Sequence, residues 1–129
     1  MKFLSMVRVA ETGQQPSERL MQEMGKLMEE MTRAGVLVST AGLRPSKEGV
    51  RMRSNHGKIS VTDGPFTETK ELVASYAVLE VKSMAEAVDW TTRFLKVLGQ
   101  GECELRPIFE APGDSAGGHP CEGPQAARI

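Results

Sequence analysis

The chain has 129 residues, of which 40% are hydrophobic and 26% charged, a length and composition typical of one globular domain. Its formal net charge is −1, so no overall positive charge exists to bind a nucleic-acid backbone. The first apolar run is too short for a signal peptide or a membrane span, and we expect a cytoplasmic protein that binds neither nucleic acid nor membrane.

Residues 3–10 carry apolar and β-branched side chains on both alternating faces, which predicts a strand covered by a helix on one side and by another surface on the other. Ser17 predicts the cap of an amphipathic helix that ends at Gly35. We interpret the apolar stripe of this helix as core: Leu20, Met24, Leu27, Met28 and Met31.

A short strand is predicted over residues 36–38, followed by a loop over 42–49. Residues 50–54 and 58–62 then predict a hairpin, because Asn, His and Gly at 55–57 accept a positive φ angle. We interpret His56 at its tip as a solvated turn residue.

Residues 72–81 form the longest strand candidate and are expected to be central in the sheet. Ser83 and Glu86 have the spacing of a capping box, which predicts a second helix ending at Gly99. We expect its buried side to consist of Ala87, Trp90, Thr91, Phe94 and Leu98. The last strand, 102–109, is expected at an edge because Pro107 has no N–H to donate.

Residues 111–129 are rich in glycine and proline and are interpreted as a C-terminal tail outside the folded domain, 1–110. Two cysteines, Cys103 and Cys121, are expected to be reduced thiols because they do not form a disulfide framework. His119 and Cys121 lack a second ligand pair at metal spacing, so we predict no metal site.

The order of elements predicts an α+β fold, a ferredoxin-like βαββαβ sandwich with an extra hairpin. Two helices cover one face of its antiparallel sheet. Because the other face keeps apolar residues from the first and the long strands, we predict a homodimer that buries this face and encloses a space for a small-molecule ligand.

Residues 63–71, Asp-Gly-Pro-Phe-Thr-Glu-Thr-Lys-Glu, place a turn and many polar side chains between two apolar runs. Asp63 has two interpretations: a turn residue that accepts backbone N–H groups, or a catalytic general acid or base in a cavity. Phe66 is also interpretable as an anchor that packs the turn onto the core. The candidate ligand-binding residues are Arg44, Phe66, Lys70, Glu71 and Tyr76.

This segment resembles the signature of the YCII-related, or DGPF, family, and shorter blocks such as residues 42–46 and 104–107 follow in the same order along 1–111. The resemblance implies a ferredoxin-like fold that pairs as a dimeric α/β barrel. In the narrower YCII branch a histidine and an aspartate are proposed as catalytic, but Ser17, Glu18 and Arg19 stand where that histidine is expected. Other departures are Ala41, Arg44 and the segment 74–77.

We therefore predict binding of a small metabolite in a cavity of the dimeric barrel, with cofactor-free acid–base chemistry as a further hypothesis. The alternative is a non-catalytic regulatory or structural dimer, for example an accessory to an extracytoplasmic sigma factor, as the resemblance to domains encoded near such factors implies.

Overall fold

The computed structural model describes residues 1–13, 15–66 and 71–110. In these residues the chain forms strands, two α-helices and a short 3-10 helix. Their bounds in chain order are β1 Lys2–Val9, α1 Glu18–Arg33, β2 Leu37–Gly42, η1 Ser46–Glu48, β3 Val50–Asn55, β4 Lys58–Asp63, β5 Leu72–Glu80, α2 Met84–Leu98 and β6 Glu102–Pro107. The tail, with Cys121, lies outside the described residues.

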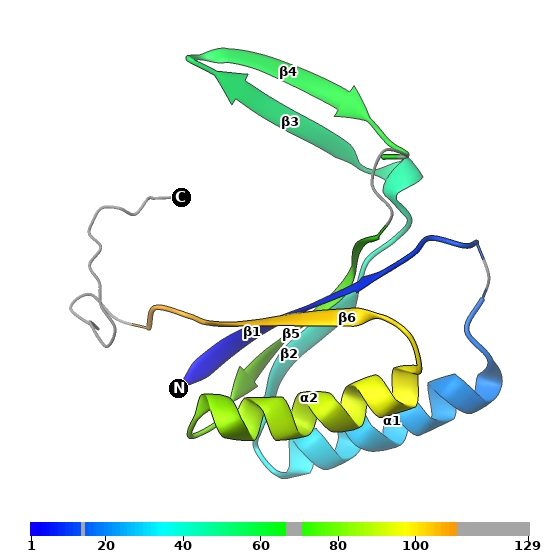
Figure 1. The fold of residues 1–129 in the computed structure, drawn as a ribbon, viewed down its shortest axis with the longest axis vertical. Helices are drawn as coiled ribbons and strands as arrows, with labels where there is room; N and C mark the ends of the chain where they lie inside the picture. The colour runs from blue at the N-terminus through cyan, green and yellow to red at the C-terminus, as the bar shows by residue number, and fades with distance from the viewer. Residues whose placement is uncertain (14, 67–70, 111–129) are drawn as a thin grey trace.

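A four-stranded antiparallel sheet, in the order β2-β5-β1-β6, is covered on one face by α1 and α2 (Figure 1). This α+β arrangement is compatible with the predicted ferredoxin-like fold. The prediction that the long strand is central is confirmed, because β5 lies between β2 and β1. The last strand is at an edge of the four-stranded sheet, as expected from Pro107.

Both predicted helix starts are confirmed by their caps. Ser17 Oγ accepts the N–H of Leu20 at 3.0 Å, and Ser83 Oγ accepts the N–H of Glu86 at 3.2 Å. The capping box differs in one detail, because the Glu86 carboxylate accepts the N–H of Lys82 rather than that of Ser83. The carboxylate thus reaches one residue further back than the motif predicts.

Burial alternates along β1, which shows which side chains face the helices. Phe3, Ser5 and Val7 are buried, whereas Leu4 and Met6 are half-buried on the opposite side. We call the side away from the helices the open face. Through the strand register it carries the apolar side chains Leu4, Met6, Tyr76 and Val78.

The close-packed core lies between one end of the sheet and the helices. It consists of Phe3, Leu27, Met31, Val36, Leu79, Val81 and Ala87. We call this the closed end of the helix–sheet layer. At the other end lie the N-terminal half of α1 and the C-terminal half of α2, side by side because the two helices run antiparallel (Figure 1). We call this the open end.

The β3–β4 hairpin is a separate two-stranded sheet, on the side of the main sheet opposite the helices (Figure 1). Its strands each extend one residue beyond the prediction, so the turn contains only His56 and Gly57. Both have positive φ angles, 55° and 88°. This is the geometry that a two-residue hairpin turn needs, and it confirms His56 as a turn residue.

In the described part of the chain, no helix is both long and apolar enough to cross a membrane.

Candidate functional site

The helix–sheet layer is filled unevenly because the strands carry side chains of different size along their length. At the closed end, Phe3, Leu37 and Leu79 share one row across the sheet. The next rows toward the open end carry small residues on the helix-facing side: Thr40, Ala77 and Ser5, then Gly42, Ser75 and Val7. The small side chains leave space beneath the helices.

Helix α1 follows the same gradient of packing. Leu27 and Met31, toward its C-terminus, are buried, while Leu20 and Met24 are only half-buried and Met21 is 62% exposed. The predicted apolar stripe is therefore core only in its second half. Its first half forms one wall of an opening instead.

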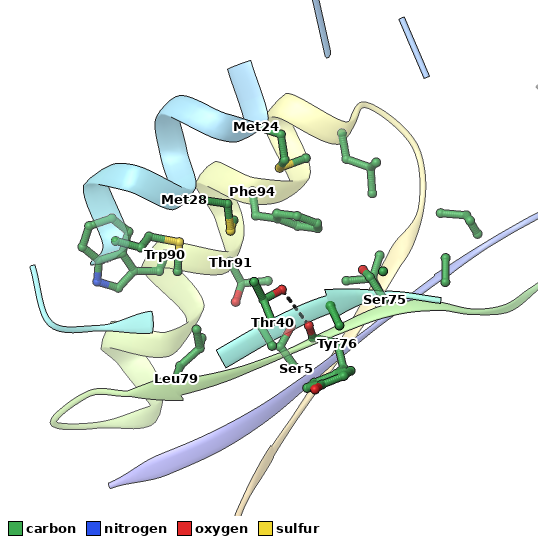
Figure 2. A pocket seen from close by; sticks show the side chains of 18 of the residues that line it. Ser5, Met24, Met28, Thr40, Ser75, Tyr76, Leu79, Trp90, Thr91 and Phe94 are labelled. Atoms are coloured by element: carbon green, nitrogen blue, oxygen red, sulfur yellow. Dashed lines mark hydrogen bonds between the residues drawn. The ribbon is translucent and has the colours of Figure 1, made fainter. Parts of the chain in front are cut away.

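This opening is a cavity of about 590 Å³ between the helices and the sheet (Figure 2). The volume lies within the range of small-molecule sites. Its helix-side lining is Leu20, Met21, Met24, Met28, Met31, Trp90, Thr91, Phe94 and Leu98. No Asp, Glu, Lys, Arg or His is among the described residues that line it.

Four hydroxyl groups interrupt this apolar lining between the sheet and the helices: three on strands and one on α2. The Ser5 hydroxyl is bonded to the Cys103 thiol at 2.9 Å, and the Thr40 hydroxyl donates to the Tyr76 carbonyl at 2.8 Å. Thr91 is only 8% exposed, and its hydroxyl has no hydrogen-bond partner among the described residues. Figure 2 shows this hydroxyl directed from α2 toward the sheet. The fourth is the hydroxyl of Ser75, which likewise has no hydrogen-bond partner among the described residues.

The Cys103 thiol is half-buried beside Ser5 on the helix-facing side of the sheet. Burial raises the pKa of this thiol, and the hydrogen bond with Ser5 offsets that rise only in part. Because the thiolate is the reactive form, the position of Cys103 favours a structural rather than a nucleophilic role.

Of the candidate ligand-binding residues, Tyr76 is part of the cavity lining. Its pairing with Met6 nevertheless directs the side chain to the open face. Figure 2 shows the Tyr76 ring on the far side of the strands from Trp90 and Phe94. Tyr76 therefore borders the cavity through the strand and presents its phenol to the opposite surface.

Asp63 lies at the end of β4, paired with Val50, and is exposed. It is not among the residues that line the cavity. Its carboxylate has no hydrogen bond or ion pair within the described residues. The N–H of Phe66, three residues after Asp63, donates to Ser46 Oγ at 3.3 Å instead. The general acid or base role of Asp63 stays a prediction.

The turn at residues 63–66, which we call the signature turn, lies close to the backbone of η1. Gly64 donates its N–H to the Gly49 carbonyl at 3.0 Å. A Cβ atom at Gly64 would lie 1.7 Å from the Ser46 carbonyl oxygen, so only glycine fits this position. Ser46 is held in turn by Glu11, whose carboxylate accepts both its N–H and its hydroxyl. These contacts thus join the base of the hairpin to η1 and, through Ser46, to the segment that follows β1.

The remaining candidates lie apart from the cavity. Arg44 is exposed and paired with Glu48 through two contacts of 2.7 and 3.3 Å. Phe66 is half-buried, with the guanidinium of Arg51 in the hairpin 4.1 Å from its ring centre, and its packing onto the core stays a prediction. Glu71 is exposed and lies immediately before β5. Lys70 lies outside the described residues.

Helical spacing predicts core positions for the cavity-lining residues of the helices, apart from Met21, and it assigns neither Thr91 nor Trp90 to a site. A signal for them was present in the strands. The small residues at helix-facing positions of β2 and β5, opposite a run of methionines, indicate missing volume once the strand register is known.

Two comparisons with known proteins bear on this chain. No curated protein matches it. The family model of the YCII-related domain matches residues 1–111, which includes all the described strands and helices. The chain is therefore a member of the YCII-related family.

Proposed function

We propose that the protein binds a small, uncharged and mainly apolar molecule in the open-end cavity. The observation that carries this proposal is the Thr91 hydroxyl, which is buried, directed into an apolar cavity and without a partner among the described residues. Leaving a hydroxyl buried without a hydrogen bond costs about 1–3 kcal/mol. A ligand atom that bonds Thr91 would recover that energy.

The lining determines which chemistry the cavity accepts. A charged ligand would lose its hydration without meeting an opposite charge, because no charged residue of the described chain lines the space. Methionine side chains adapt to irregular apolar shapes, as Met24 and Met28 are placed to do, and Phe94 adds a rigid aromatic surface. The expected ligand is an aromatic or aliphatic molecule with one polar group for Thr91 or Ser75.

The proposal for this cavity is ligand binding without acid–base catalysis, because its described lining has no charged residue or histidine. Acid–base catalysis needs a titratable group within hydrogen-bond reach of the substrate. The tyrosine that borders the cavity presents its phenol to the open face, and Asp63 is not part of the lining. If Asp63 performs chemistry, it does so at another surface, so Asp63→Asn is expected to leave cavity binding unchanged.

The proposal includes a homodimer that pairs through the open face as a dimeric α/β barrel. Its support is the row of apolar side chains there, Leu4, Met6, Tyr76 and Val78, which no described element covers. Sheets bury such a face by packing on another layer. The ion pairs Lys2–Glu80 (3.1 Å) and Arg8–Glu104 (2.8 Å) border this apolar row with charge.

The chain contains a built-in reporter for the binding test, because its one tryptophan, Trp90, lines the cavity. We would titrate the protein with phenylnaphthylamine, an uncharged fluorescent probe, and with its sulfonated anionic analogue. Saturable quenching of Trp90 by the uncharged probe and much weaker binding of the anion are expected. Equal binding of the two probes, or no quenching of Trp90, would contradict the proposal.

A further inference from the structure

The β3–β4 hairpin has one face on which four of the six side chains are apolar, the other two being Ser54 and Asp63. Cross-strand pairing places Met52 opposite Val61 and Ser54 opposite Ile59, and Val50 lies on the same face because strand side chains alternate. The four apolar residues are between 55% and 63% exposed. We call Val50, Met52, Ile59 and Val61 the apolar arm face.

The β3–β4 hairpin is not expected to be stable as an isolated pair of strands. Two-stranded hairpins are marginal in water unless a third strand or another layer covers a hydrophobic face. In the described residues the hairpin is joined to the body at its base, where Gly64 meets Gly49 and Ser46, and it stands away from the helices (Figure 1). Its apolar face therefore lacks a covering layer within the described chain.

Charge distinguishes the hairpin from the rest of the molecule. Arg51, Arg53 and Lys58 against Asp63 give residues 50–63 a formal charge of +2, so the remainder of a chain of net −1 carries −3. The three basic residues lie on the face opposite the apolar arm face. A partner that packs on the apolar arm face does not contact these basic residues, but the positive hairpin attracts at longer range a partner of opposite charge sign, and the rest of this chain has that sign.

The location of the two uncovered apolar surfaces identifies the partner as a second copy. The hairpin stands on the side of the sheet that carries the open face (Figure 1), so a copy that covers the open face lies within its reach. Specific stable interfaces bury about 1,200–2,000 Å² in total. Four hairpin side chains supply only a part of that area, and the open face is needed to supply the rest.

We propose that the β3–β4 hairpin is an exchange arm, whose apolar arm face packs against a second copy of this chain. In a two-fold dimer the same contact occurs twice, so each copy holds the other with its arm. The inference rests on the pairing proposed above, and it adds a role for the hairpin and for the signature turn that fixes its base. It does not depend on the cavity, which lies on the opposite side of the sheet.

The first test compares two double variants at adjacent cross-strand pairs of the hairpin. Met52→Ser with Val61→Ser removes apolar surface from the arm face, and Arg53→Lys with Ser60→Thr changes the adjacent cross-strand pair on the polar face while keeping the charge of the hairpin. By sedimentation equilibrium, we expect the arm variant to raise the dimer dissociation constant at least about tenfold and the control by less than about threefold. Equal effects of the two variants, or a monomeric wild-type protein, would overturn the proposal.

The second test needs no variant that weakens the hairpin. A photo-crosslinking amino acid replaces Met52 in an equal mixture of isotope-labelled and unlabelled chains, and mass spectrometry identifies the products. Mixed-isotope crosslinks from position 52 are expected, because the arm contacts the other copy. Crosslinks only within one chain would overturn the proposal. Quenching of Trp90 by the uncharged probe, measured on the same samples, reports separately on the cavity.

Discussion

The two ends of the helix–sheet layer are built from the same helices, yet one is packed and the other is hollow. Leu27 in α1 is 4% exposed at the closed end, whereas Leu20, two turns earlier on the same apolar stripe, lines the cavity. The difference originates in the strands, where Phe3 and Leu79 face the helices at one end and Ser5 and Ser75 face them toward the other. An amphipathic helix thus specifies an apolar side, and the sheet beneath decides whether that side becomes core or cavity.

Truncation of a leucine at each end is the strongest test of this comparison. Leu27→Ala should lower the free energy of unfolding by about 2–5 kcal/mol, because it leaves a void among close-packed neighbours. Leu20→Ala, the same chemical change on the same helix, should cost less than about 1 kcal/mol because the cavity already exists there. Urea denaturation measures both values. Similar losses at the two positions would show that the ends are packed alike.

Replacing a methionine with a larger residue should lower stability at the closed end and weaken ligand binding at the open end. Met31→Trp overfills the closed end and should destabilise the protein by about 1–3 kcal/mol. Met24→Trp occupies the cavity instead, with little loss of stability and at least about tenfold weaker binding of phenylnaphthylamine. Thermal unfolding and the fluorescence of the probe itself supply the two readouts. Undiminished probe binding by Met24→Trp would place the binding site elsewhere.

Thr91 and Thr92 are neighbours with hydroxyls in different surroundings. The Thr91 hydroxyl is directed into the cavity, whereas the Thr92 hydroxyl is hydrogen-bonded on the surface. Thr92 donates to the Val88 carbonyl at 2.7 Å and is exposed, so Thr92→Val is a matched control. Thr91→Val keeps the side-chain volume and should raise stability by up to about 1 kcal/mol, since it removes an unpaired buried hydroxyl. It should also weaken binding of the probe, which carries an N–H group, by about 3–10-fold. If the two variants bind equally well, Thr91 does not contact the ligand.

The smallest effect concerns the ion pair that joins the helices. Arg93 donates to the Glu30 carboxylate at 2.7 and 2.9 Å and lowers the pKa of Glu30 below its usual 4.5. A folded-state pKa below the unfolded value gives stability that is present above about pH 4.5 and is lost as pH falls through the lower value. Denaturation between pH 6 and pH 3 should show a slightly shallower acid loss for Glu30→Gln than for the neighbouring exposed Glu29→Gln. Identical pH profiles of the two variants would contradict this role.

Much of the fold was predictable because it depends on local signals. Ser17 and Ser83 fixed the helix starts, and Pro107 predicted an edge strand, since caps and missing donors act within a few residues. The Gly64 contact with Ser46 was not predictable, because it joins segments that meet only after folding. Dimerisation remains a prediction from the apolar open face.

The candidate site was harder to predict for a related reason. Methionines at helical spacing indicate an apolar side, but whether Met24 meets a large or a small residue depends on the register of β1, β2 and β5. The prominent polar segment at 63–71 directed sequence analysis toward Asp63, whereas the described part of that segment lies away from the cavity and secures the hairpin base.

The central claim is that the open end, rather than the open face or the hairpin, holds the ligand. The eight methionines sample all these regions, so isotope-labelled methionine methyl groups can locate a bound molecule by intermolecular nuclear Overhauser effects. With phenylnaphthylamine bound, we predict contacts to the methyl groups of Met24 and Met28 and none to that of Met52. Contacts to Met6 or Met52, without any to Met24 and Met28, would contradict the account.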